Sequence, residues 1–168
     1  MLESDKVLLT LPMYYSYGLS VINSHLLVGA CMVLTDYSMV NREFWDVLKQ
    51  QEITSFAGVP YQYETIMRLR FTQMELPTLR YFTQAGGRLN PSLVTRLVDF
   101  SLQNDKQFFV MYGQTEATAR ISYLAPNDIK RYFKFFVILN SFLNDFIGFS
   151  CSFFLNFGAK NATILPFK

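Results

Sequence analysis

Short apolar runs recur along the first 126 residues, and segments of helical period follow them. The runs are apolar throughout, as strands are when helices cover both faces of a parallel sheet. They span residues 7–11, 30–35, 53–57, 79–84 and 107–111. After each of the first four runs, apolar residues return every three or four positions, which predicts a helix. This alternation predicts an α/β fold: a doubly wound, mostly parallel sheet with flanking helices.

Two asparagines mark predicted helix starts. Asn41 precedes a segment with Glu43 in its first turn, where a negative charge is favourable. Asn90 precedes Pro91, whose missing N–H costs nothing at the first helical position. Trp45 lies on the apolar face of the first of these helices, so it is predicted to be a core residue.

The pattern changes after Pro126. Phenylalanine, asparagine, lysine and isoleucine dominate residues 127–168, with no clear period. We therefore predict a domain over residues 1–126 and a separate Phe-rich tail after it. Residues 132–157 are very apolar, but asparagines and an aspartate interrupt them. A membrane span needs roughly 20 mainly apolar residues, so membrane association is not favoured.

The composition narrows the classes of function. The 168 residues carry a formal net charge of +2, which argues against nucleic acid as a partner. The two cysteines and the single histidine, His25, do not stand at metal-ligand spacings, so no zinc site is expected. Cys31 lies in an apolar run and is predicted to be a small core residue. His25 is interpreted as a structural or surface histidine, not a catalytic one. No signal peptide is visible at the start, which favours a cytoplasmic location.

Three turns follow predicted strands and form the candidate site. In a doubly wound sheet, ligands bind beyond the carboxyl ends of the strands, so these turns are expected to face a ligand. They are Gly58-Val59-Pro60, Ala85-Gly86-Gly87 and Tyr112-Gly113-Gln114-Thr115-Glu116.

The third turn combines groups that suit a nucleotide. The Tyr112 ring can stack on a base, and the Thr115 hydroxyl can bond a phosphate oxygen. The Glu116 carboxylate can hold Mg²⁺, which prefers hard oxygen ligands. The residues alone leave a second interpretation open, a polar loop in which Thr115 or Glu116 caps a following helix.

Four segments together resemble the adenylate-forming ligases, the family of acyl-CoA synthetases, luciferases and peptide-synthetase adenylation domains. Residues 112–116 resemble its Tyr-Gly-x-Thr-Glu signature, and residues 11–19 resemble its Leu-Pro-x-aromatic-His-x-x-Gly segment. The turn at residues 58–60 is similar to its Val-Pro turn, and residues 85–87 are similar to its adenine-side glycine loop. The four segments stand in the family's order within residues 4–126.

The resemblance implies activation of a carboxylic acid with ATP and Mg²⁺ to an acyl-adenylate, then transfer to the thiol of coenzyme A or a carrier protein. It implies that Thr115 contacts the AMP phosphate and that Glu116 binds Mg²⁺ and assists ATP. The implied nucleotide-binding residues are Gly86, Gly87, Tyr112, Gly113, Gln114 and Thr115. The implied borders of the acyl pocket are Tyr14, Tyr15, Gly18 and Gly87.

The chain also departs from the family pattern. Tyr15 stands where many members carry histidine, and residues 127–168 do not resemble the family. The sequence contains no Ser/Thr/Gly-rich phosphate loop ending in lysine, no later ribose-binding aspartate and no C-terminal catalytic lysine. We therefore expect an internal piece of a ligase that is inactive alone. Two alternatives stay open: a non-catalytic nucleotide-binding or interaction module, and a membrane-associated protein.

Overall fold

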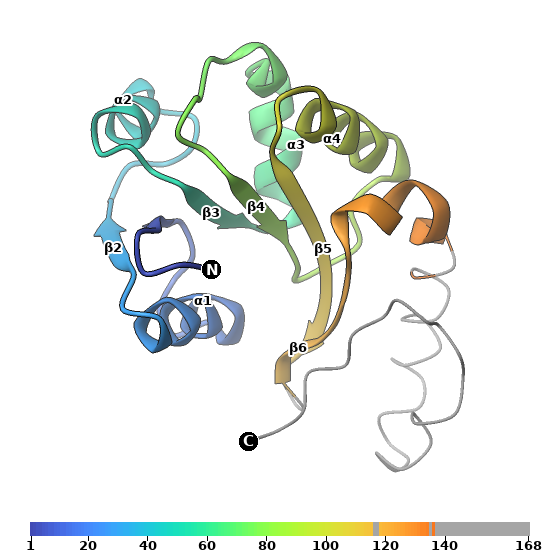
Figure 1. Ribbon diagram of the computed structural model, residues 1–168, viewed down its shortest axis with the longest axis horizontal. Coiled ribbons are helices and arrows are strands. Elements are labelled where there is room, and N and C mark those ends of the chain that lie inside the picture. The colour runs from blue at the N-terminus through green and yellow to red at the C-terminus, as the bar shows by residue number, and fades with distance from the viewer. Residues whose placement is uncertain (116–117, 135, 137–168) are drawn as a thin grey trace.

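Six strands form one sheet in the computed structural model, which describes residues 1–115, 118–134 and 136 (Figure 1). The strand order is β2-β1-β3-β4-β5-β6. The first five strands run parallel, and β6 is antiparallel to β5. The bounds are β1 Lys6–Leu9, β2 Cys31–Leu34, β3 Ser55–Gly58, β4 Tyr81–Gln84, β5 Gln107–Gln114 and β6 Thr118–Leu124.

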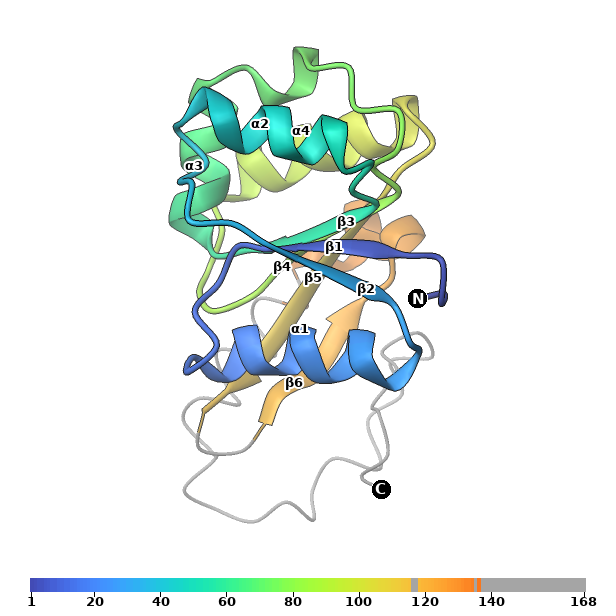
Figure 2. The same cartoon turned by 90° about the vertical axis from the view of Figure 1, so that its left-hand side faces the viewer.

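Helices α1 to α4 cover the two faces of the sheet (Figure 2). Three of them, α2, α3 and α4, lie on one face, and α1 lies on the other, beside β6. The doubly wound α/β fold predicted from the sequence is confirmed. The bounds are α1 Ser16–Leu27, α2 Arg42–Gln50, α3 Pro60–Arg68 and α4 Pro91–Gln103, with short 3₁₀ turns at Phe71–Gln73 and Pro126–Asp128.

One buried side chain from each central strand forms a row across the sheet. Leu8, Phe56, Phe82 and Phe108 are partners in the strand register, and each is at most 2% exposed. The Phe82 and Phe108 rings stack at 4.9 Å between centroids. The row belongs to the main core under α2–α4, while a smaller core with Val7 lies under α1. Both faces of the central strands are therefore buried, which explains why these strands are mainly apolar.

The first five strands differ from the predicted runs by at most two residues at either end, except at the end of β5. β5 runs on to Gln114, because the antiparallel strand β6, which the sequence analysis did not predict, pairs with its second half. The capping prediction holds for Asn90, whose side chain accepts from the Ser92 N–H at 2.9 Å. The Asn41 side chain instead accepts from a residue before it, the Ser38 N–H at 3.1 Å.

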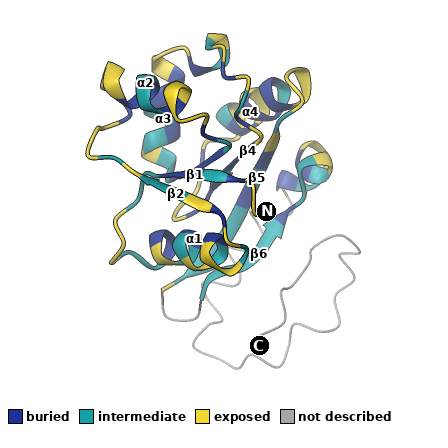
Figure 3. Ribbon diagram, turned by 60° about the vertical axis from the view of Figure 1, so that its left-hand side comes forward, coloured by how far each residue is buried: buried dark blue, intermediate teal, exposed yellow. Residues whose placement is uncertain are grey.

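The prediction that Cys31 is a core residue is wrong. Cys31 is exposed at the start of β2, whose two end residues are both exposed (Figure 3). β2 is the edge strand of the sheet and pairs only with β1 within the described residues. Trp45 is buried in the main core as predicted, and its ring N–H donates to the Met39 carbonyl at 2.9 Å.

The main core continues past the predicted boundary at residue 126. Ile129 is 1% exposed and Phe133 is 8% exposed, and both pack into the main core together with Phe136. Ile129, Phe133 and Phe136 therefore contribute to the same core as the strands. The division into residues 1–126 and 127–168 stays a prediction, and most of the second part lies outside the described residues.

No helix in the described part of the chain is long and apolar enough to cross a membrane. The apolar stretch at residues 132–157 lies mostly outside that part.

Candidate functional site

The carboxyl ends of the parallel strands meet at one edge of the sheet, which we call the carboxyl edge. β3 ends there at Gly58, β4 at Gln84 and β5 at Gln114. The first residue of α1 lies at the same edge, because the Ser16 and Thr115 hydroxyl oxygens are 3.2 Å apart. The fold thus places two segments 99 residues apart in sequence next to each other, as the rule for doubly wound sheets predicts.

Gly86 and Gly87 present their backbone at the carboxyl edge. Both are exposed, with φ angles of +77° and +152°, a region that favours glycine. A β-carbon on Gly86 would collide with the Tyr15 hydroxyl, and one on Gly87 would lie 3.1 Å from the Pro60 ring. The Gln84 side-chain amide donates to the Gly87 carbonyl at 2.8 Å. The loop is therefore fixed in shape while its backbone is open to a ligand.

The N-terminus of α1 adds a second feature that suits an anion. The helix begins at Ser16 after Tyr15, whose side chain makes no capping hydrogen bond. The first N–H groups of a helix lack partners within it and carry a partial positive charge. With the hydroxyls of Ser16 and Thr115 beside them, these groups form a donor set of the kind that binds phosphate. Hydroxyl oxygens are also hard ligands, which fits Mg²⁺.

The sequence analysis predicted that residues 112–114 belong to a turn. In the structure these residues form the end of β5. Gly113 lies tightly against β6, since a β-carbon there would collide with the Ala119 carbonyl. Tyr112 packs against the main core, and burial raises the pKa of its hydroxyl. Thr115 lies in the turn beyond the strand and is exposed, whereas Glu116 lies outside the described residues.

The residues expected to border an acyl pocket occupy different places. The Tyr15 hydroxyl lies against Gly86, so the structure brings Tyr15 to the glycine loop. The Tyr14 side chain is 93% exposed and is not enclosed by a cavity. Gly18 is buried in α1, where a β-carbon would collide with the Pro12 carbonyl. Their roles toward an acid stay predictions.

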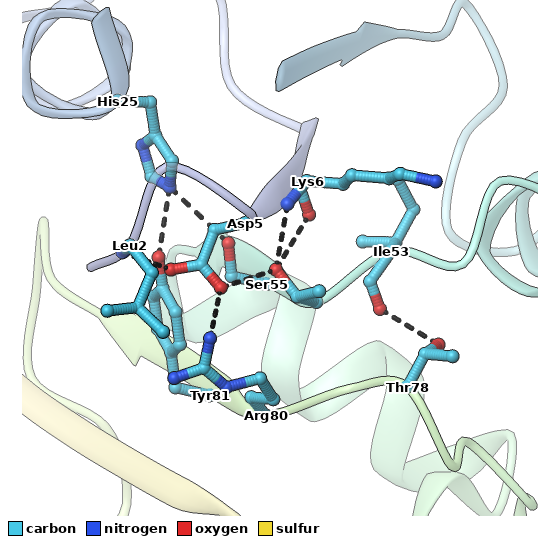
Figure 4. A network of polar contacts seen from close by, with 10 residues as sticks. Leu2, Asp5, Lys6, His25, Ile53, Ser55, Thr78, Arg80 and Tyr81 are labelled. Carbon is cyan, nitrogen blue, oxygen red and sulfur yellow. Dashed lines mark hydrogen bonds and ion pairs between the residues drawn. The ribbon is translucent and has the colours of Figure 1, made fainter. Parts of the chain in front are cut away.

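His25 is structural, one of the two alternatives left by the sequence. It is 4% exposed, and its Nδ1 donates to the Val21 carbonyl at 2.7 Å while Nε2 lies 3.0 Å from the Tyr81 hydroxyl (Figure 4). Burial lowers the pKa of His25. The neutral ring can therefore accept a hydrogen bond from Tyr81. In the same network, the fully buried Asp5 carboxylate accepts from Arg80 at 2.6 Å.

Arg120 is a candidate site residue that the sequence analysis missed. It lies on β6 and lines two cavities of about 30 Å³ and 300 Å³. Polar and apolar residues alternate from Thr118 to Tyr123, and this is the pattern of a half-buried strand. That alternation could have revealed β6, and with it the position of Arg120.

Within residues 1–115, 118–134 and 136, no three side chains of His, Cys, Asp or Glu cluster as a metal site. The expected Mg²⁺ ligand, Glu116, is not among these residues.

The fold and the carboxyl edge together define a class of protein: an α/β domain with a glycine loop, a helix N-terminus and two neighbouring hydroxyls at one edge of its sheet, an arrangement that suits a phosphate group. This class holds many families, and sequence comparison distinguishes among them. The chain belongs to the AMP-binding enzyme family, which residues 1–134 match. The resemblance to the adenylate-forming ligases is confirmed, and the match extends past residue 126.

Two relatives are CoA ligases. The chain is 29% identical over 129 residues to the chloroplastic/peroxisomal 2-succinylbenzoate–CoA ligase of Arabidopsis thaliana, covering 75% of this chain and 22% of that protein. It is 31% identical over 129 residues to the indoleacetate–CoA ligase of Aromatoleum aromaticum, covering 76% of this chain and 24% of that protein. The chain therefore spans less than a quarter of the length of either relative.

A solved structure has the same fold. The o-succinylbenzoate CoA synthetase of Bacillus subtilis, in complex with its acyl-adenylate intermediate, matches with a TM-score of 0.66 and 22% identity. The match covers 79% of this chain and 26% of that one. Other structures of the same enzyme contain AMP, or ATP with a magnesium ion.

Proposed function

We propose that this chain is the part of an AMP-forming carboxylic acid–CoA ligase that holds the AMP portion of the nucleotide and one side of the acid. The observation that carries the proposal is the meeting of the Gly86-Gly87 loop, Tyr15, Ser16 and Thr115 at the carboxyl edge. The family match supports it, as do the CoA ligases among the relatives.

Each group has a part that follows from its chemistry. The exposed backbone of Gly86 and Gly87 lets the flat adenine approach closely, since no side chain stands there. The Thr115 hydroxyl and the N-terminus of α1 hold phosphate oxygens, and preorganised donors of this kind stabilise the charge that develops there. Mg²⁺, held by Glu116 as the family resemblance implies, would neutralise charge on the reacting phosphate.

Calorimetric titration of the 168-residue chain with AMP and with ATP–Mg²⁺ tests the proposal. We expect Glu116→Gln to weaken ATP–Mg²⁺ by about tenfold or more, because it keeps the shape but removes the charge that Mg²⁺ needs. We expect Gly87→Val to weaken both nucleotides, because its side chain would occupy the space that the ligand needs.

Matched controls separate the site from general effects on the fold. Glu43→Gln makes the same charge change at an exposed position on α2. Gly29→Val places the same side chain at another glycine of positive φ (+71°), just after α1 and away from the carboxyl edge. Equal nucleotide binding by the wild type and both site variants would place the site elsewhere.

The thiol acceptor in this proposal is coenzyme A, because both curated relatives are CoA ligases. A carrier-protein thiol is the alternative acceptor. The proposed location is the cytoplasm, where ATP and coenzyme A are available.

A further inference from the structure

Arg120 is a partly buried cation that lies against α1. Its guanidinium donates to the Ser20 carbonyl and to the Ser20 hydroxyl, the latter at 3.2 Å, and to the Ser24 hydroxyl at 2.8 Å. All of these acceptors are neutral. No carboxylate of the described residues forms an ion pair with Arg120. Burial lowers the pKa of Arg120, yet a guanidinium stays protonated in proteins.

The positive charge of Arg120 borders space that a ligand could fill. The cavity of about 300 Å³ is at the lower end of the range for small-molecule pockets. Its aromatic wall is formed by Tyr81, Phe109 and Tyr123, whose rings meet edge to face. Arg80 also lines the cavity, but Asp5 already neutralises its charge at 2.6 Å. Arg120 is therefore the cation in this cavity wall whose charge the described residues leave uncompensated.

Helix α1 fixes the distance from Arg120 to the carboxyl edge. Ser16, Ser20 and Ser24 lie one turn apart along the helix, so they share one face. Ser16 contacts Thr115, while Ser20 and Ser24 contact Arg120. A helix rises 1.5 Å per residue, so the guanidinium lies roughly 6–12 Å along the α1 axis from the Thr115 hydroxyl.

We propose that Arg120 binds a second carboxylate of the acid substrate, so that the preferred acid is a dicarboxylate whose acidic groups are roughly 6–12 Å apart. The inference rests on the proposed function, because it assumes that the reacting carboxylate lies at Thr115. A bound carboxylate would supply the countercharge that the described residues do not give Arg120. A planar guanidinium is suited to carboxylate through two parallel hydrogen bonds.

The test is a ligand-observed NMR titration of the 168-residue chain with succinate, adipate, suberate and sebacate, each beside its monomethyl ester. The esters keep the length but lose one charge, so the wild type alone already tests the second carboxylate. We expect adipate and suberate to bind about 10- to 100-fold more tightly than their esters. Succinate is too short to span the distance and should show no such preference.

Variants then assign the preference to one residue. Arg120→Met should abolish the advantage of adipate over its ester, and Arg120→Lys should keep part of it. Arg96→Met is the matched control, because it removes the same charge from an exposed position on α4, on the other face of the sheet. Circular dichroism shows whether each variant keeps the fold, since Arg120 also ties β6 to α1.

The outcomes separate this inference from the proposed function. It is overturned if adipate and its ester bind wild type equally, if neither binds, or if folded Arg120→Met keeps the preference. Nucleotide binding that persists in any of these cases leaves the proposed function intact. A diacid preference without nucleotide binding would support Arg120 as a carboxylate site and count against the proposal that this chain holds the nucleotide.

Discussion

His25 shows how burial turns a single side chain into a source of pH-dependent stability. Burial lowers its pKa in the folded chain, outweighing Asp5, which favours the charged ring. Arg120 adds to the lowering. In the unfolded chain the pKa returns to about 6.5. The unfolded state then binds more protons than the folded state in acid, so stability present above pH 6.5 is lost as the pH falls below it.

We expect the free energy of unfolding in urea to drop between pH 7 and pH 5 more steeply for the wild type than for His25→Gln. Glutamine removes the titrating group and keeps a polar side chain beside Tyr81. This window lies above the usual pKa values of carboxylic acids, so their titration interferes little. Parallel pH profiles of the two proteins would show that His25 does not carry the effect.

The sequence alone predicted which residues lie at the carboxyl edge, but not which side chains from other elements pack beside them. The position of Gly86, Gly87 and Thr115 at the carboxyl edge could be predicted because each follows a predicted strand of a parallel sheet. Their roles toward a ligand stay predictions. Arg120 could not be predicted, since its importance depends on Ser20 and Ser24, about a hundred residues earlier in the sequence. Cys31 was misplaced for a similar reason: its apolar neighbours predict a strand but do not reveal that the strand lies at the edge.

The elements themselves were largely predictable, because the central strands β1, β3 and β4 are largely buried on both faces and therefore mainly apolar. β6 was missed because the prediction relied on continuous apolar runs, whereas β6 is a half-buried strand in which polar and apolar residues alternate. Its pairing also converts the Tyr-Gly-Gln segment from a predicted loop into strand. The two errors have one cause: residues 112–114 are strand because they pair with β6, so missing β6 also meant predicting these residues as a turn.

The segment after β6 provides a prediction at the scale of elements. A chain ending at residue 126 lacks Ile129, Phe133 and Phe136, whereas a chain ending at residue 136 keeps them in the main core. Burying each such side chain contributes about 1.5–3 kcal/mol. We expect the shorter chain to be less stable to urea by about 4 kcal/mol or more.

The full chain with Phe133→Ala is the matched control for this truncation, because it removes one of the three contacts without changing the length. It should lose about 3 kcal/mol or more. Equal stability of the two truncated chains would restore the domain boundary predicted at residue 126.

At the scale of the whole molecule, the question is whether the 168 residues can carry out adenylation. They include the glycine loop and the Thr115 turn but no counterpart of the family's lysine-bearing phosphate loop or C-terminal lysine. Loss of one preorganised donor costs on the order of 10²–10³ in rate in other enzymes. We expect no acid-dependent exchange of labelled pyrophosphate into ATP by the 168-residue chain, with adipate, acetate, benzoate and palmitate as acids.

The Glu116→Ala variant sets the background of this exchange measurement. Exchange clearly above that background would show that the chain is a working ligase by itself. Nucleotide binding without exchange would favour the alternative, a non-catalytic nucleotide-binding module.

The ion pair between Asp5 and Arg80 can form only after both residues have been synthesised, so it delays part of the folding on the ribosome. The two residues are 75 positions apart, and β1 lies between β2 and β3 in the sheet. At roughly 5–20 residues per second, Arg80 is made roughly 4 to 15 seconds after Asp5. Until Arg80 has been synthesised, the Asp5 carboxylate lacks this charged partner. Strand β1, which follows Asp5, therefore stays unprotected in the nascent chain. Chaperones therefore have access to the segment around Asp5 before the sheet encloses it.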